Sequence, residues 1–209
     1  IAIEAEAMGF DFVAPVEHHF TDYAACPDPV QLLSYIAAKT TTLELMPGAI
    51  ILPWNDPLRV VEKMLMLDIL SEGRAILGMG RGAARREFRS FGVELADSRE
   101  MFDEAAVIIL EGLETGIVEA DGKWYRIPRT EIRPRPFRSF RDRAVMVSMS
   151  PSSVEVAGRY GHCGFRKGIG PARCLKSTAT GPTSGRRRAA KRHHSSFAIS
   201  SFASMTSRR

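Results

Sequence analysis

The sequence has 209 residues, 44% of them hydrophobic, and a formal net charge of +5 at pH 7. This length suffices for one domain with a substantial core, and no apolar run approaches the roughly 18 residues that a transmembrane helix requires, so we expect no membrane association. The three cysteines lie in no C-x-x-C or histidine-rich spacing. We therefore expect neither a disulfide framework nor a metal site, and a cytoplasmic location.

The charge is divided unevenly along the chain. All 24 acidic residues lie within residues 1–155 together with 17 of the 29 basic ones, whereas residues 156–209 carry the other 12 basic residues and no acid. The regular pattern of apolar runs and turns also ends near residue 161. We therefore predict a folded part, residues 1–161, followed by a basic tail, residues 162–209.

Three interpretations fit the composition of the tail. It contains few large apolar side chains and no helical or alternating period, so it is expected to be disordered. A nucleic-acid-binding tail is the second interpretation, but the tail lacks the interleaved aromatic side chains that stack on bases, so nucleic acid is not the expected partner. The third, which we favour, is an out-of-frame or non-native translation, which would enrich the segment in arginine and serine and remove acidic residues.

The beginning of the chain has the pattern of an interrupted element. Residues 3–9 are typical of the second half of a helix that is closed by a glycine, Gly9. Because the chain opens at Ile1 without a methionine or a leader, we expect the true N-terminus to be missing.

The following segments alternate short apolar strands with helices. Asp28-Pro29 and Asp56-Pro57 each supply an N-cap and a first-turn proline, and Asp97 with Glu100 resembles a capping box. The predicted elements are a strand over 11–16, a helix over 29–39, an apolar run over 43–52 that should bend at Pro47-Gly48, a helix over 56–71, a strand over 74–79, a helix over 98–114, an excursion over 124–128, a strand over 144–148 and a helix over 152–160.

This order predicts an α/β fold with a parallel sheet and crossover helices. Four strands with their helices fit half of an eight-stranded (β/α)8 TIM barrel or an open doubly wound sheet, and spacing alone does not separate the two. In both folds the chemistry lies at the carboxyl ends of the strands. A half barrel leaves an unpaired edge, so residues 1–161 alone are expected to be marginally stable.

Two adjacent histidines, His18 and His19, directly follow the first predicted strand, next to Glu17. On an extended segment neighbouring side chains point to opposite sides, so only one imidazole faces a pocket while the other packs behind the strand. Two interpretations remain open: one of the histidines is catalytic, or both are structural and hydrogen-bonded to Glu17 or to the backbone.

Phosphate-binding groups follow the other predicted strands. They are the Gly48-Ala49 backbone, Arg81 after the third strand, Arg99 at a helix start, and Ser150 and Ser153 before a helix N-terminus. Guanidinium forks, hydroxyls and helix N-terminal N–H groups satisfy the oxygens of a phosphate, so a phosphate-bearing cofactor across the strand ends is expected. Gly78-x-Gly80-x-Gly82 is not a dinucleotide fingerprint, because its third glycine comes too early.

Motifs in a family-like order over residues 1–161 resemble the bacterial luciferase-like, flavin-dependent monooxygenases. The motifs are Gly9-Phe10-Asp11, Glu17-His18-His19-Phe20-Thr21, Ala49-Ile50-Ile51-Leu52-Pro53, the Pro57-Leu58-Arg59 helix start, Gly73-Arg74, Gly80-Arg81-Gly82, Glu87-Phe88-Arg89-Ser90-Phe91-Gly92 and Ser98-Arg99. The resemblance implies a partial (β/α)8 TIM barrel over residues 1–161, with the first strand of the family missing before Ile1. Gly80 stands where luciferase has a reactive cysteine, which implies a monooxygenase that does not emit light.

The resemblance also implies roles for residues. His18 is the expected catalytic histidine beside the flavin ring, and His19 its structural neighbour. Gly48 and Ala49, joined by a cis peptide bond, are expected to pack under the ring, while Arg81, Arg99, Ser150 and Ser153 are expected to hold the phosphate of FMN.

The implied reaction uses reduced FMN and dioxygen to oxygenate a small organic substrate, with a flavin reductase as the source of reduced FMN and a homodimer as the assembly. Two alternatives stay open: a deazaflavin-dependent oxidoreductase of the same superfamily, and a flavin-binding remnant without catalytic activity.

Overall fold

The structure is a computed structural model that describes residues 1–22, 24, 26–148, 163–166 and 196–197. Its helices are α1 (Ala2–Ala7), α2 (Pro29–Ala37), α3 (Pro57–Leu70), α4 (Arg85–Phe91) and α5 (Ser98–Thr115), with a 3-10 turn at Leu52–Trp54. Its strands are β1 (Phe12–Val13), β2 (Glu44–Leu45), β3 (Ile50–Ile51), β4 (Leu77–Gly80), β5 (Ile117–Asp121), β6 (Arg126–Glu131), β7 (Ala144–Ser148), β8 (Cys163–Arg166) and β9 (Ser196–Phe197).

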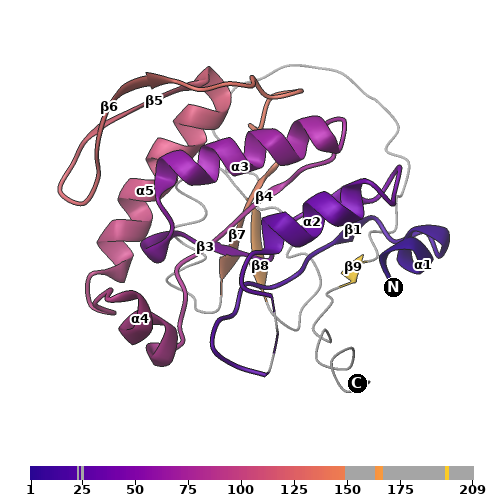
Figure 1. Cartoon of the computed structure of the whole chain (residues 1–209), viewed down its shortest axis with the longest axis horizontal. Helices are drawn as coiled ribbons and strands as arrows, with labels where there is room; N and C mark the ends of the chain where they lie inside the picture. The colour runs from indigo at the N-terminus through magenta and orange to yellow at the C-terminus, as the bar shows by residue number, and fades with distance from the viewer. Residues whose placement is uncertain (23, 25, 149–162, 167–195, 198–209) are drawn as a thin grey trace, which may run out of the picture.

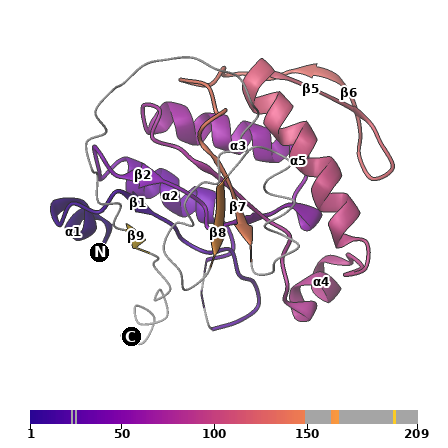
Figure 2. The ribbon, with the colours of Figure 1, turned by 180° about the vertical axis from the view of Figure 1, so that it is seen from behind.

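The central strands are parallel and follow one another in space. β1 pairs with β2, β3 with β4, β4 with β7, and β7 with β8, all in parallel. A bridge between Leu45 and Ala75 joins the two groups of strands. Along the chain α2 lies between β1 and β2, and α3 lies between β3 and β4. Both helices cover one face of the sheet, so they stand in front of the strands in Figure 1 and behind them in Figure 2. This is the βαβ arrangement that the sequence predicts.

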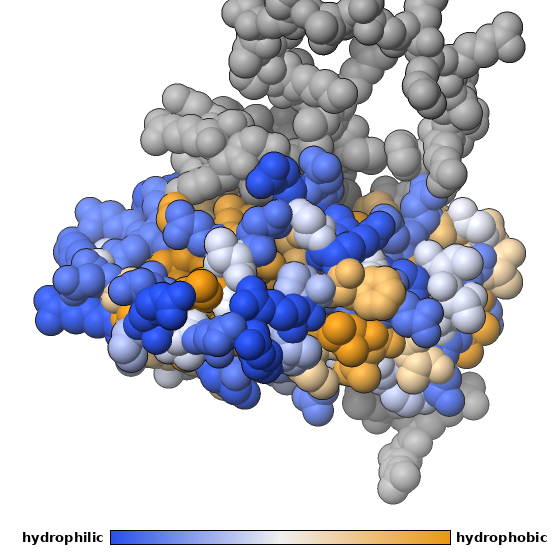
Figure 3. Space-filling view, turned by 90° about the horizontal axis from the view of Figure 1, so that it is seen from above, coloured by the Kyte–Doolittle hydropathy of each residue, from blue (hydrophilic) through white to orange (hydrophobic). Residues whose placement is uncertain are grey.

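The core lies between these helices and the strands. Leu77 and Met79 of β4, Met64 of α3 and Phe102 of α5 are all fully buried. The helical spacing of apolar residues in α3 and α5 turns one face of each helix to this core. In Figure 3, which views the molecule from above, hydrophilic side chains predominate, and apolar side chains gather in smaller areas between them. None of the described helices is long and apolar enough to cross a membrane.

Several predicted local features are confirmed. Asp28 caps α2 by accepting hydrogen bonds from the N–H groups of Val30 and Gln31, and Asp56 caps α3 through the N–H of Arg59. The apolar run over 43–52 is broken into β2 and β3 on either side of Pro47 and Gly48. These features depend on neighbouring residues, which is why sequence predicts them.

Other expectations need correction. Asp97 precedes α5 but makes no side-chain cap hydrogen bond, and its backbone is already in the right-handed helical region, so it is not half of a capping box. The excursion is longer than predicted: β5 and β6 form an antiparallel hairpin that packs on α5. The helix α4 was not predicted, although Gly92, which ends it with a φ of 68°, is a recognisable C-terminal signal.

Two short described strands fall in the predicted tail. β8 pairs with β7, and β9 pairs in parallel with β1 on the side away from β2. Most of residues 162–209, and the predicted helix over 152–160, lie outside the described residues, so the disorder of the tail stays a prediction.

Candidate flavin site

The ends of the parallel strands meet at one edge of the sheet. The Gly48 N–H donates to the carbonyl of Pro15 at 2.8 Å, which places the segment after β1 beside the bend between β2 and β3. Ile51 of β3 lies opposite Gly80 of β4, the residue before Arg81. The Gly48–Ala49 peptide bond is cis, as the resemblance implies. Pairing therefore gathers three of the segments that sequence reasoning selected.

Two glycines of β4 allow this close approach. A Cβ atom at Gly78 would lie 1.8 Å from the carbonyl oxygen of Pro47. Only a shift of the backbone could relieve this clash. At Gly80 a Cβ would lie 3.1 Å from the Cβ of Ala49, so there is little space for a side chain at Gly80, although more than at Gly78. The bend over 47–49 and β4 are therefore in direct backbone contact.

Glu17 is a buried carboxylate that fixes the end of β1. Its Oε1 accepts hydrogen bonds from Trp54 Nε1 at 2.6 Å and Asn55 Nδ2 at 3.2 Å, and its Oε2 accepts from the Ile51 N–H at 3.1 Å. Oε1 also lies 3.1 Å from His19 Nε2. Burial raises the pKa of the Glu17 carboxyl, while the hydrogen bonds from Trp54, His19 and Ile51 act against that rise.

The two histidines have different surroundings. The His19 side chain is 12% exposed and lies in an aromatic cluster, edge-on to Phe91 with ring centroids 4.8 Å apart. The His18 side chain is 34% exposed, and its Nδ1 lies 3.0 Å from Oε1 of the buried Glu87. The structure thus separates a packed imidazole from a more accessible one, which is the division that strand geometry predicts.

Two arginines, Arg81 and Arg99, lie close enough for their charges to interact. Arg81 directly follows β4 and donates from Nη1 to the hydroxyl of Ser98 at 3.0 Å, while the same hydroxyl donates to the carbonyl of Leu95. Burial lowers the pKa of the Arg81 guanidinium, and the positive charge of Arg99 lowers it further. Two neighbouring guanidinium groups can neutralise an anion that carries two negative charges and donate hydrogen bonds to its oxygens. Ser150 and Ser153 lie outside the described residues.

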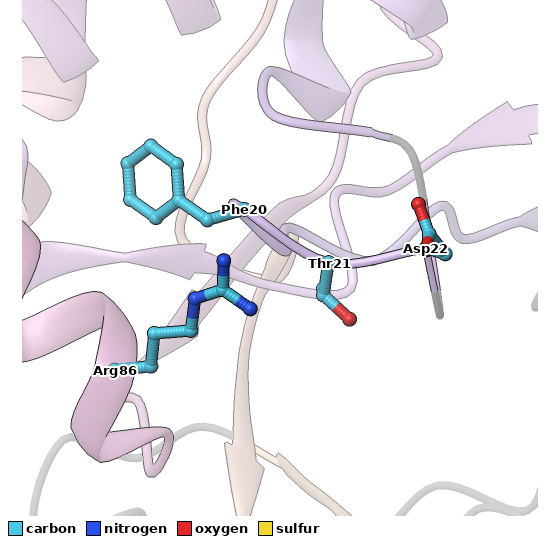
Figure 4. A pocket seen from close by; sticks show the side chains of 4 residues that line it. All are labelled: Phe20, Thr21, Asp22 and Arg86. Atoms are coloured by element: carbon cyan, nitrogen blue, oxygen red, sulfur yellow. The ribbon is translucent and has the colours of Figure 1, made fainter.

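An open cavity of about 750 Å³ adjoins the histidine segment, with Phe20, Thr21, Asp22 and Arg86 among its lining residues. In Figure 4 the Arg86 side chain extends from α4 toward the loop that carries Phe20 and Thr21. Sequence reasoning missed Arg86, because an arginine in a run of basic residues carries no signal of its own. Within the described part of the chain, no group of three or more His, Cys, Asp or Glu side chains could hold a metal ion.

The described residues fit a phosphate-bearing flavin. The cationic pair Arg81 and Arg99 suits the phosphate, the histidine segment adjoins a cavity, and the Gly48–Ala49 peptide bond is cis. Sequence reasoning placed Glu87 and Ser98 in the family motifs but gave them no role; in the structure they contact His18 and Arg81. Each lies far along the chain from its partner, so only the folded structure reveals the contact.

The sequence profile described as luciferase-like monooxygenase matches residues 1–208. The chain belongs to this family. It is 31% identical over 157 residues to the alkanal monooxygenase alpha chain of Photorhabdus luminescens, a match that covers 75% of this chain and 43% of that protein. Members of the family are flavin-dependent monooxygenases and oxidoreductases, and the family that the sequence motifs predict is confirmed.

Solved structures of the family share the fold of this chain. The monooxygenase RslO1 from Streptomyces bottropensis superposes with a TM-score of 0.73 at 31% identity, covering 78% of this chain and 51% of that one. The oxygenating constituent of 3,6-diketocamphane monooxygenase from Pseudomonas putida, solved with FMN, gives a TM-score of 0.69 at 21% identity, covering 79% and 50%. The fold is thus a part of the luciferase-like TIM barrel, as the resemblance implies, and the chain spans about half the length of these relatives.

Proposed function

We propose that this luciferase-like chain binds FMN and takes part in the oxygenation of a small organic substrate by reduced FMN and dioxygen. The observation that carries the proposal is the place of Arg81. It follows β4 at the strand edge shared with the His18 segment and the Gly48–Ala49 bend, and it contacts Ser98, the neighbour of Arg99. A flavin reductase as electron source and a homodimeric assembly belong to the same proposal.

The phosphate of FMN is a monoester that carries close to two negative charges at neutral pH. The proposed contact with Arg81 and Arg99 offsets the repulsion between the two guanidiniums and returns the pKa of Arg81 toward its ordinary value. Ser98 holds one nitrogen of Arg81, so the guanidinium is oriented before the cofactor arrives. Ser150 and Ser153 are proposed as further phosphate ligands.

The protein residues have three proposed tasks. Reduced flavin, when bound, supplies the electrons with which dioxygen is activated. Gly48 and Ala49 contact the flavin ring through their backbone, Arg81 and Arg99 hold the phosphate, and His18 holds or moves a proton beside the ring. The family contains flavin-dependent oxygenases, and the residues of this site are compatible with that chemistry.

A binding experiment with paired ligands tests the cofactor. We expect the purified chain to bind FMN, and Arg81→Ala to weaken that binding by about 10- to 100-fold, because a charge-assisted hydrogen bond contributes about 1.5–3 kcal/mol. Riboflavin, which lacks the phosphate, should bind Arg81→Ala and the wild type alike. Arg129→Ala, at an exposed position of the β5–β6 hairpin, is the matched control and should leave FMN binding unchanged.

Three outcomes of this titration would contradict the proposal. Failure of the wild-type chain to bind FMN would refute a formed site in this polypeptide. Equal loss of FMN and riboflavin binding in Arg81→Ala would refute the phosphate role of Arg81. Binding of a deazaflavin in clear preference to FMN would favour the hydride-transferring oxidoreductase instead.

A further inference from the structure

A second buried carboxylate, Glu87, contacts both histidines of the strand-end segment. It is 3% exposed and belongs to the first turn of α4, 69 residues beyond His18. Its Oε1 accepts the backbone N–H of His19 at 2.9 Å and lies 3.0 Å from His18 Nδ1. One oxygen therefore holds the backbone of the segment and the ring of His18 together.

The chemistry of these groups assigns the proton on His18. A backbone N–H can only donate, so Oε1 of Glu87 acts as an acceptor in the contact with His19. The same acceptor requires a donor at His18, which is Nδ1–H. A neutral imidazole has a single N–H, so the lone pair of neutral His18 is on Nε2.

The neighbouring histidine is held in the opposite way. Glu17 Oε1 accepts from the indole N–H of Trp54, which can only donate, and from the side-chain amide of Asn55. The same oxygen lies 3.1 Å from His19 Nε2, so His19 carries its proton on Nε2. Two buried carboxylates thus set opposite tautomers in two adjacent residues.

We propose that Glu87 is a positioning residue that keeps the proton of His18 on Nδ1, so that Nε2 is the atom that accepts and returns a proton in the flavin-dependent reaction. Glu87 itself remains an acceptor and touches neither substrate nor flavin. The catalytic part of this inference rests on the proposed function, whereas the tautomer depends only on the protein.

The tautomer is measured by long-range 1H–15N NMR of the full 15N-labelled chain without flavin, at about pH 8.5, which is about two units above the ordinary histidine pKa. The variants His18→Gln and His19→Gln assign the two signals among the five histidines. We expect the Nδ1–H pattern for His18 and the Nε2–H pattern for His19. An Nε2–H pattern for His18 in the wild type would overturn the proposal.

Variants of Glu87 separate its acceptor from its charge. Glu87→Ala removes the acceptor, and His18 is expected to adopt the Nε2–H tautomer that a free histidine side chain prefers, while His19 is unchanged. Glu87→Gln keeps an acceptor oxygen at the same place and should retain the Nδ1–H form, which also covers the case in which Glu87→Ala does not fold. Glu94→Ala, at an exposed position nearby, is the control. An unchanged His18 tautomer in Glu87→Ala, or its loss in Glu87→Gln, would overturn the assignment.

The catalytic part is tested by stopped-flow mixing of the reduced FMN complex with dioxygen. Without substrate, reduced FMN passes two electrons and two protons to dioxygen and yields oxidised FMN and hydrogen peroxide. Glu87→Ala and His18→Gln should each change the rate of flavin oxidation by about tenfold or more, and the double variant should equal His18→Gln, since Glu87 acts through His18. Additive effects would overturn the positioning role. Absence of FMN binding in the wild type would refute the proposed function but leave the tautomer result standing.

Discussion

The ion pair between Asp68 and Arg143 offers a sharp test of how this fold is held together. Asp68 lies on α3 with no exposed surface, and Arg143, directly before β7, is 8% exposed. Their contact is two-pronged: Nη1 lies 2.5 Å from Oδ1, and Nη2 lies 3.3 Å from Oδ2. Arg143 also donates to the carbonyl of Ala75 at 2.6 Å, so the pair joins α3, the segment before β4 and the start of β7.

Asp68→Asn keeps the volume of the side chain but removes its charge. The Asp68 Oδ2 also accepts the backbone N–H of Phe137 at 2.9 Å, so an amide NH₂ at either oxygen position would face a donor. Breaking one partner of a buried ion pair costs about 3–5 kcal/mol, because the other charge stays buried without compensation. Against a total stability of about 5–15 kcal/mol, this loss is large.

Urea unfolding followed by circular dichroism measures the effect. With a slope of about 2 kcal/mol per molar urea, a loss of about 4 kcal/mol lowers the midpoint by about 2 M. Asp142→Asn, an exposed neighbour in sequence, is the control and should shift the free energy of unfolding by less than about 0.5 kcal/mol. A double-mutant cycle with Arg143→Met should give a coupling energy of about 1–3 kcal/mol. Equal small shifts for Asp68→Asn and Asp142→Asn would refute the reasoning.

Three further predictions concern local features of the same fold. The Thr42 N–H, with further hydrogen bonds from Leu43 and Thr41, lowers the pKa of Glu6 to about 2. A lowered carboxyl pKa stabilises the fold above the ordinary pKa of 4.5, and this contribution is lost as the pH falls toward 2. The free energies of unfolding of the wild type and Glu6→Gln should therefore differ by about 1 kcal/mol at pH 7, after allowance for solvent screening, and the difference should vanish between pH 4.5 and 2. A difference that stays constant with pH would contradict this prediction. Gly78→Ala should lower the free energy of unfolding in urea by about 3 kcal/mol, because the new Cβ would collide with the Pro47 carbonyl. Gly92→Ala has open space around its Cβ but a φ of 68°, so it should lower that free energy by only about 1 kcal/mol. Similar losses for the two variants would show that the backbone relaxes at Gly78. Asp28→Ala removes the cap of α2 and the contact with Lys63, and should lower the thermal midpoint in proportion to about 1–2 kcal/mol, with Asp22→Ala as the exposed control.

The sequence by itself determined the features that depend on near neighbours. Asp28 and Asp56 mark helix starts because a cap acts within three residues, and Pro47-Gly48 marks a bend because its effect on the backbone is local. The motif around His18 was enough to predict the family, which the comparisons confirm. The assignment of Asp97 as a capping box was wrong, because a sequence pattern does not fix the backbone angles at the cap.

Only the tertiary structure decided which groups act on one another. Glu87 lies 69 residues from His18 and Asp68 lies 75 residues from Arg143, and no local pattern links either pair. Their contacts arise because parallel strands place the segments after β1 and β4 at one edge, while α3 crosses the start of β7. The sequence shows that Glu87 carries a carboxylate. Its proposed effect on the proton of His18 depends on the distance of 3.0 Å between Glu87 Oε1 and His18 Nδ1, which only the folded chain provides.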